Sequence, residues 1–286
     1  MHRAVLLLAL GIVLAPVGAL RAAETAPVAK PAAGPAIPAH HTALKVFAIT
    51  ESTDAGRQAP VPGPGKPVYV LLHSGGQKDW GEARARDPSP AEAMLQTQLE
   101  AALAVRHYQP ATADHPPSVV LIYNWGIHGS PGAGMDDLGF RNLLDRAALV
   151  GGRKFATDLH AAIEAETLSA AATSTRPWGA QLEGMRPTSA AGLMQPSSPY
   201  EMFRRRNQLT ERLLEEISDD VYYFIVSAFD HAALARGEQR LLWRTKVSTS
   251  AQGTSMASAI PALIRGGGGH FGQELSEPVL SSQPAD

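Results

Sequence analysis

The sequence predicts an α+β fold in a single domain, with a partly antiparallel sheet and helices packed on it. One observation is VYYFIVSAF (221–229), a continuous apolar run typical of a buried strand. A second is RLLWRTKVS (240–248), whose alternating pattern is typical of a strand with one face in solvent. The connection between them is short, which favours an antiparallel pair, because a parallel return needs a crossover of about a dozen residues or more. The third observation is helical periodicity at 90–107, 136–167 and 200–217.

The remaining elements follow in chain order. Strands are predicted at LKVFAIT (44–50), VYVLLHS (68–74) and SVVLIYNWG (118–126). The first helix is expected to have Ser89 as its N-cap, and the second to be interrupted at Gly151 and Gly152. In the third, Glu201 with Arg205 and Arg212 with Glu216 stand at i,i+4 spacing, which predicts a solvated helix face.

Composition divides the chain into five parts. Residues 1–22 are predicted to be a signal peptide, 23–41 a disordered Ala/Pro linker and 42–273 the α+β domain. Within the domain, a long loop rich in Ser, Thr, Ala, Pro and Gly is expected at about 168–199. Residues 274–286 are expected to be a flexible tail.

The first 22 residues predict export. A short basic start precedes an apolar run from Ala4 to Leu20, and small residues allow cleavage after Ala19 or Ala22. An uncleaved anchor is the alternative, although the run contains Pro16 and is short for a spanning helix, which needs about 20 apolar residues. After cleavage no integral membrane segment is expected, so the protein is predicted to be periplasmic or extracellular.

Composition also excludes several classes of site. The net charge of −2 provides no concentrated basic face, so we expect no nucleic-acid partner. The chain has no cysteine, which excludes disulfides, thiolate metal sites and acylation of an N-terminal cysteine. His160 and Glu164 are four residues apart on a predicted helix, and without an H-E-x-x-H pattern we expect a surface pair. No metal site, no cofactor and no specific partner is assigned.

The segment GTSMAS (253–258) is identical to the stretch that carries the catalytic serine of subtilisin-like proteases. Asp54, His128 and Ser255 also occur in the chain order of that family's triad. However, His128 is followed by GSPGAG, where the family has a helix, and the strands predicted after Val221 leave no room for the family's helical crossovers. The local alternative is a helix that Thr254 or Ser255 caps, with Met256, Ile260 and Leu263 on one face.

The C-terminal part resembles a group of uncharacterised exported bacterial proteins. The resemblance rests on an LWRT-type strand, a glycine, a short helix of the LPALI type and a closing Phe-Gly, which here are Leu242 to Thr245, Gly253, Ile260 to Ile264, Phe271 and Gly272. This resemblance implies a structural role for these residues and no activity.

The sequence therefore favours a non-enzymatic envelope or extracellular protein with a binding or structural role, and no residue is assigned as catalytic. A subtilisin-like serine hydrolase that uses Ser255, His128 and Asp54 is the alternative.

Overall fold

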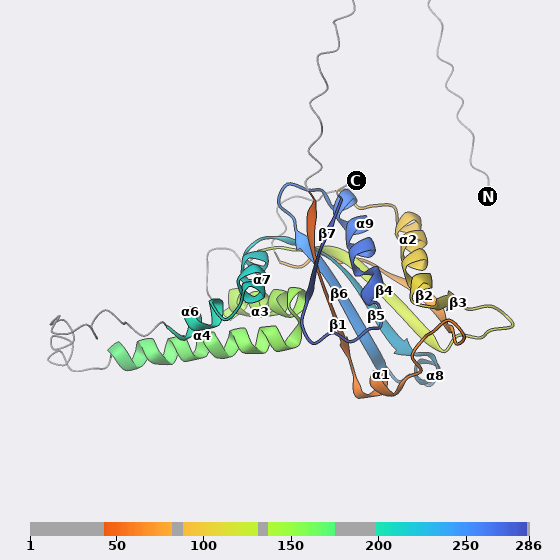
Figure 1. The fold of residues 1–286 in the computed structure, drawn as a ribbon, viewed down its shortest axis with the longest axis horizontal. Helices are drawn as coiled ribbons and strands as arrows, with labels where there is room; N and C mark the ends of the chain where they lie inside the picture. Colours follow the sequence, from red (N-terminus) through yellow and green to blue (C-terminus); the bar gives the residue numbers. More distant parts are fainter. Residues whose placement is uncertain (1–42, 82–87, 131–136, 175–197, 285–286) are drawn as a thin grey trace, which may run out of the picture. The chain divides into compact units, whose positions relative to one another are not determined.

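The structure is a computed structural model that describes residues 43–81, 88–130, 137–174 and 198–284, and its centre is one seven-stranded mixed sheet (Figure 1). The strands lie in the order β3-β2-β4-β5-β6-β1-β7. Their bounds are Leu44–Ser52 (β1), Val68–Gln77 (β2), Tyr108–Pro110 (β3), Val119–His128 (β4), Val221–Asp230 (β5), Leu241–Ser250 (β6) and Val279–Gln283 (β7).

The sheet is parallel at one end and antiparallel over the rest. Strand β2 is parallel to both β3 and β4, whereas the β4–β5, β5–β6, β6–β1 and β1–β7 pairs are antiparallel. The antiparallel pairing of β5 with β6 confirms the hairpin expected from the short connection. The α+β class is confirmed.

One face of the sheet is covered by α2 (Glu92–Val105) and α9 (Met256–Gly267), which η2 (Gly268–His270) follows directly (Figure 1). In α9 a run of residues from Ala259 to Ile264 is completely or almost completely buried. These side chains pack with alternate residues of β4, namely Val119, Leu121, Tyr123, Trp125 and Ile127. The larger of the two hydrophobic clusters therefore lies between the sheet and α9.

Of the described helices, the other face carries α3 (Asp137–Val150), α4 (Gly152–Ser174), α6 (Pro199–Arg204) and α7 (Gln208–Ser218). Their apolar side chains form a second cluster with Phe47, Val221, Tyr223 and Ile225 of the sheet. Two short helices, α1 (Asp54–Gln58) and α8 (His231–Ala235), follow β1 and β5. None of the described helices has the length and apolarity that a bilayer-spanning helix requires.

Several boundaries differ from the sequence prediction. Helix α2 begins at Glu92 without a side-chain cap, because Ser89 Oγ instead accepts a hydrogen bond from Trp125 Nε1 at 3.1 Å. The predicted loop at about 168–199 begins later, because α4 continues to Ser174. The single helix expected at 200–217 is two helices, since Asn207 adopts an extended backbone and caps α7.

Two further predictions are wrong for the described residues. The tail expected at 274–286 contains β7, which pairs with β1. Strand β6 has no solvated face, because helices cover both sides of the sheet and Lys246 is 8% exposed. The signal peptide and the linker, residues 1–41, lie outside the described residues.

Candidate functional site

Ser255 is the N-cap of α9. Its Oγ accepts a hydrogen bond from the backbone N–H of Ser258 at 3.3 Å, and its backbone is extended while Met256 begins the helix. This confirms the capping role. Met256, Ile260 and Leu263 are buried on one face of α9, as the periodicity predicted.

His128 faces away from Ser255. It is the last residue of β4, and the alternate residues before it, such as Trp125 and Ile127, pack on the α9 face. Successive side chains of a strand point to opposite sides, so the His128 ring lies on the α3 side, while Ser255 begins a helix on the other side. The structure does not bring these two side chains together.

Asp54 lies at the opposite end of the sheet from His128. The strand register aligns Ser52 with Trp243, Trp243 with Ala228, and Ala228 with Leu121. His128 is seven residues beyond Leu121 on β4, which corresponds to roughly 23 Å along the strand. Asp54 forms an exposed ion pair with Arg57. Thus the three residues of the hydrolase alternative are distributed over two ends and two faces of the sheet.

An aromatic and basic cluster surrounds His128 at the carboxyl end of β4. The Trp80 ring stacks on Tyr223 with centroids 4.8 Å apart and contacts the His128 ring edge-on at 5.7 Å. The Tyr223 hydroxyl donates to the carbonyl of Lys78. Because His128 is 3% exposed, burial lowers its pKa, so the ring is neutral at pH 7.

Arg146 of α3 completes this cluster and is fully buried. Its Nη1 donates to the carbonyl of Asp219 at 2.6 Å, and Nε and Nη2 have no hydrogen-bond partner among the described residues. Burial lowers the Arg146 pKa to about 10, against the opposing charges of Asp220 and Asp219. In this cluster Trp80 is the side chain that reaches solvent, at 40% exposure. We interpret the role of this cluster as structural, because its side chains pack together at the end of the sheet.

An apolar groove lies among the four helices on the α3 side. Its volume is about 400 Å³. Five aliphatic side chains line it, together with four residues that bring polar groups: Leu143, Leu159, Ile163, Leu214 and Ile217, with Glu166, Thr167, Tyr200 and Ser218. One of the two carboxylate oxygens of Glu166 already has a partner, because Oε2 accepts a hydrogen bond from the Tyr200 backbone N–H at 3.3 Å.

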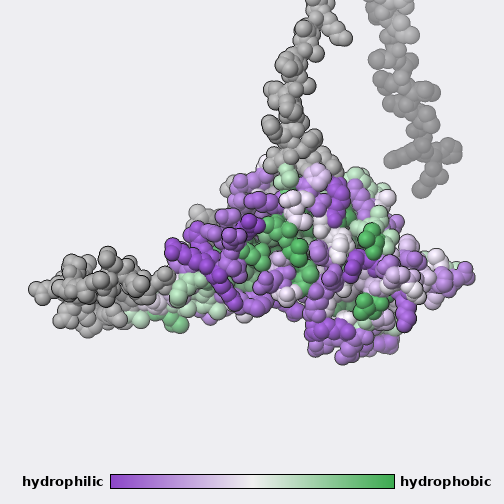
Figure 2. Space-filling view, in the orientation of Figure 1, coloured by the Kyte–Doolittle hydropathy of each residue, from purple (hydrophilic) through white to green (hydrophobic). Residues whose placement is uncertain are grey.

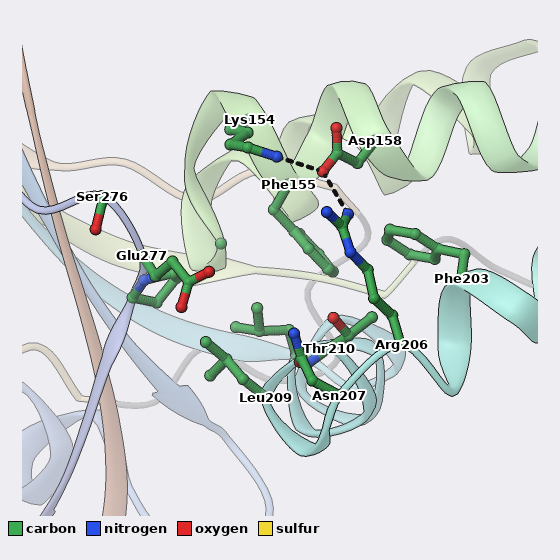
Figure 3. A pocket seen from close by; sticks show the side chains of 13 residues that line it. Lys154, Phe155, Asp158, Phe203, Arg206, Asn207, Leu209, Thr210, Ser276 and Glu277 are labelled. Atoms are coloured by element: carbon green, nitrogen blue, oxygen red, sulfur yellow. Dashed lines mark hydrogen bonds and ion pairs between the residues drawn. The ribbon is translucent and has the colours of Figure 1, made fainter.

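A smaller hollow lies at the start of α7 (Figure 3). Lys154 and Arg206 both contact the Asp158 carboxylate, at 2.7 and 3.0 Å, and these contacts lower the Asp158 pKa. The Phe155 and Phe203 rings lie behind them with centroids 5.8 Å apart. At about 120 Å³ the hollow has room for a few water molecules, each of which takes about 30 Å³ in the liquid. It is therefore small for an organic ligand.

The expected surface pair on α4 is confirmed. His160 Nε2 lies 3.3 Å from the Glu164 carboxylate, and the two side chains are 43% and 64% exposed. Within the described ranges, three or more potential metal ligands do not gather at any one point.

Comparisons with known proteins identify no family. No family model and no curated protein matches the chain. A crystal structure of a PDZ domain protein from Parabacteroides distasonis is similar with a TM-score of 0.37 and 9% sequence identity. The match covers 84% of this chain and 39% of that one.

Proposed function

We propose that this protein is an exported, non-enzymatic binding protein that holds a small, mainly apolar molecule in the groove among α3, α4, α6 and α7. The observation that carries the proposal is the groove itself. Ligand sites in proteins are typically concave, mostly apolar cavities of roughly 300 to 1,000 Å³ with a few polar groups that orient the ligand. The groove has about 400 Å³ and this composition.

The surroundings of the groove support an apolar occupant. Leu138, Leu168 and Met202 are 67%, 71% and 58% exposed, and they lie on three of the four helices that form the groove. Hydrophobic residues also reach the surface over α4 (Figure 2). Apolar surface left in water is unfavourable by about 25 cal/mol per Å², so an apolar molecule that fills the groove gains this free energy from the aliphatic side chains that line it.

The polar residues of the groove favour one hydrogen-bonding group on the ligand. The hydroxyls of Thr167 and Ser218 already donate to the carbonyls of Ile163 and Glu215, at 3.0 and 2.6 Å, so they can act as acceptors toward a ligand. Glu166 has a second carboxylate oxygen beside the one that Tyr200 uses. An anionic head group would be repelled by the negative charge of Glu166. We therefore expect a neutral molecule that donates one hydrogen bond.

The exported location rests on the sequence. The basic start, the apolar run and the small-residue exit in the first 22 residues support a cleaved signal peptide. Edman sequencing of the protein purified from its native host is expected to start near Ala22, and a chain that begins at Met1 would contradict export through this route.

A fluorescence titration tests the groove. The neutral probe N-phenylnaphthylamine is expected to bind the parent protein saturably, with increased emission. Ile163→Trp places a larger side chain in the groove and is expected to weaken binding by about tenfold or more, which is a loss of about 1.4 kcal/mol.

Leu168→Trp is the matched control, because Leu168 lies on the same helix, is exposed and is not among the groove-lining residues. This variant is expected to bind as the parent does. Equal binding by the parent and both variants would place the probe elsewhere on the surface, and no binding by the parent would contradict a neutral aromatic ligand.

A further inference from the structure

A second hollow, of about 270 Å³, lies on the other side of α7 from the apolar groove and shares no lining residue with it. Helix α7 forms one wall, and the start of β1 and the end of β6 form the other. The wall residues that carry charge or a hydroxyl are Lys45, Arg212, Glu215, Glu216, Asp219, Thr249 and Ser250. This volume is about nine times that of a water molecule in the liquid, about 30 Å³, so the hollow has room for a small organic molecule.

Glu216 is the buried acid of this hollow. The side chain was expected on a solvated face in a pair with Arg212, but it is 7% exposed, and Arg212 forms no ion pair with it in the described structure. Its Oε1 is buried without a hydrogen-bond partner. A buried polar oxygen of this kind is uncommon in folded proteins, because it has lost its water without a replacement.

The surroundings of Glu216 determine its charge. Burial, and after it the charge of the nearby Asp219, raises the pKa of Glu216 to about 8, and Lys45 opposes this shift. Lys45, Arg212 and Glu215 are exposed to solvent, where salt screens their charges. At neutral pH the Glu216 carboxyl is therefore mostly protonated, and a cation placed beside it would convert it to the carboxylate.

We propose that this hollow binds a small primary ammonium compound, with Glu216 as the counter-ion. The Glu216 carboxylate provides the anionic acceptor, and the hydroxyl of Ser250, which pairs with Val221 on the α7 face of the sheet, can accept a further hydrogen bond from the same ammonium group. With Glu216 ionised, the wall carries three carboxylates and two cations, a balance that favours a cationic ligand. A bare metal ion would leave most of the volume unfilled.

The proposal predicts a specific pH dependence. A primary alkylammonium keeps its proton below about pH 10. Between pH 6 and 9 the group whose charge changes is therefore the Glu216 carboxyl. With a pKa of about 8, about one Glu216 in a hundred is ionised at pH 6 and about nine in ten at pH 9. Because apparent affinity scales with the competent fraction, binding is expected to be at least about tenfold tighter at pH 9 than at pH 6.

The experiment is a titration of the ¹⁵N-labelled protein with n-butylammonium chloride, followed by NMR at the backbone amides of Thr249 and Gln252. Saturable chemical-shift changes are expected at pH 9. The affinity for n-butylammonium is expected to be at least about tenfold lower at pH 6. Glu216→Gln keeps the shape of the side chain and removes the charge, so it is expected to abolish both the binding and its pH dependence. Since Glu216 is already mostly neutral at pH 7, the amide variant is expected to fold.

Glu211→Gln is the matched control, because it removes the same charge from an exposed residue of the same helix that does not line the hollow. It is expected to retain the binding. The proposal is overturned if the parent shows no saturable shifts, if both variants bind equally, or if the neutral analogue n-butanol binds as tightly as n-butylammonium. Binding by calcium chloride at the same amides in place of n-butylammonium would also overturn it, in favour of a metal ion.

Discussion

Lys246 Nζ lies 2.7 Å from Glu51 Oε2 and joins the neighbouring strands β6 and β1 beneath α3. The same ammonium donates to the carbonyl of Ala148 at 2.7 Å, and the other Glu51 oxygen accepts from the Arg153 backbone N–H at 2.8 Å. One ion pair therefore attaches the α3–α4 junction to the sheet. Burial raises the Glu51 pKa, but the hydrogen bond and charge of Lys246 and the contacts from Arg153 outweigh it and hold the pKa below its ordinary value.

Removal of one partner of this pair should destabilise the protein strongly. Lys246→Met leaves the largely buried Glu51 carboxylate with the exposed Arg153 guanidinium, 3.3 Å away, as its remaining cation. The expected loss is about 3 kcal/mol of the free energy of unfolding. Urea denaturation measures it. The double variant with Glu51→Gln should lose less than the sum of the two single variants, and additive losses would show that the two side chains act independently.

Glu216 should make the protein less stable as the pH rises. Its pKa is raised in the folded state from 4.5 to about 8, chiefly by burial and then by the charge of Asp219, so the folded state holds a proton that the unfolded chain releases. The stabilisation is complete below about pH 4.5 and is lost, by on the order of a few kcal/mol, as the pH rises toward 8.

Thermal unfolding from pH 5 to 9 tests this effect. Relative to the parent, Glu216→Gln should gain stability with rising pH over this interval. Parallel curves for the parent and the variant would mean that the Glu216 carboxyl ionises normally in the folded protein.

Trp243 should be a large contributor to stability. It is 5% exposed, and its ring lies 5.9 Å from that of Tyr108, so it links β6 with the short edge strand β3. Trp243→Ala should reduce the free energy of unfolding by about 3 to 5 kcal/mol, because it leaves a cavity in the main core. Denaturation in guanidinium measures this loss, and a variant as stable as the parent would be inconsistent with the packing described.

Ser255→Ala should have the effect of a lost helix cap. The expected cost is about 0.5 to 2 kcal/mol, since the hydrogen bond to the Ser258 N–H is removed. A fluorophosphonate probe should not label the folded parent, because His128 faces the opposite side of the sheet. Stoichiometric labelling that depends on both Ser255 and His128 would contradict this arrangement.

Local signals in the sequence were sufficient for the long strands and for one strand pair, but not for the short strands β3 and β7. The short connection between Val221–Phe229 and Arg240–Ser248 allows only a hairpin, and the cap at Ser255 depends on its immediate neighbours. The α4 extension was missed because LSAAATS (168–174) was grouped with the Pro- and Gly-rich residues after it, although alanine has the highest intrinsic helix propensity.

Properties that depend on distant residues could not be predicted in the same way. Lys246 is typical of a solvated strand position, and its burial depends on Glu51, which is 195 residues away. Glu216 has the spacing of a surface pair with Arg212, but the fold places it between α7 and the sheet. The apolar groove requires side chains from four helices, so no single stretch of sequence signals it.

Strand β1 lies between β6 and β7, the last two of the described strands. During synthesis on a ribosome, β1 therefore stays without both of its neighbours until the residues up to Gln283 have emerged. A chain cut short before Val279 leaves Val46 and Ala48 on an open edge, and such edges pair readily with other molecules. Recombinant production is consequently expected to tolerate an affinity tag beyond Gln283 better than a truncation at Gly272, which should shift the product from soluble protein to aggregates.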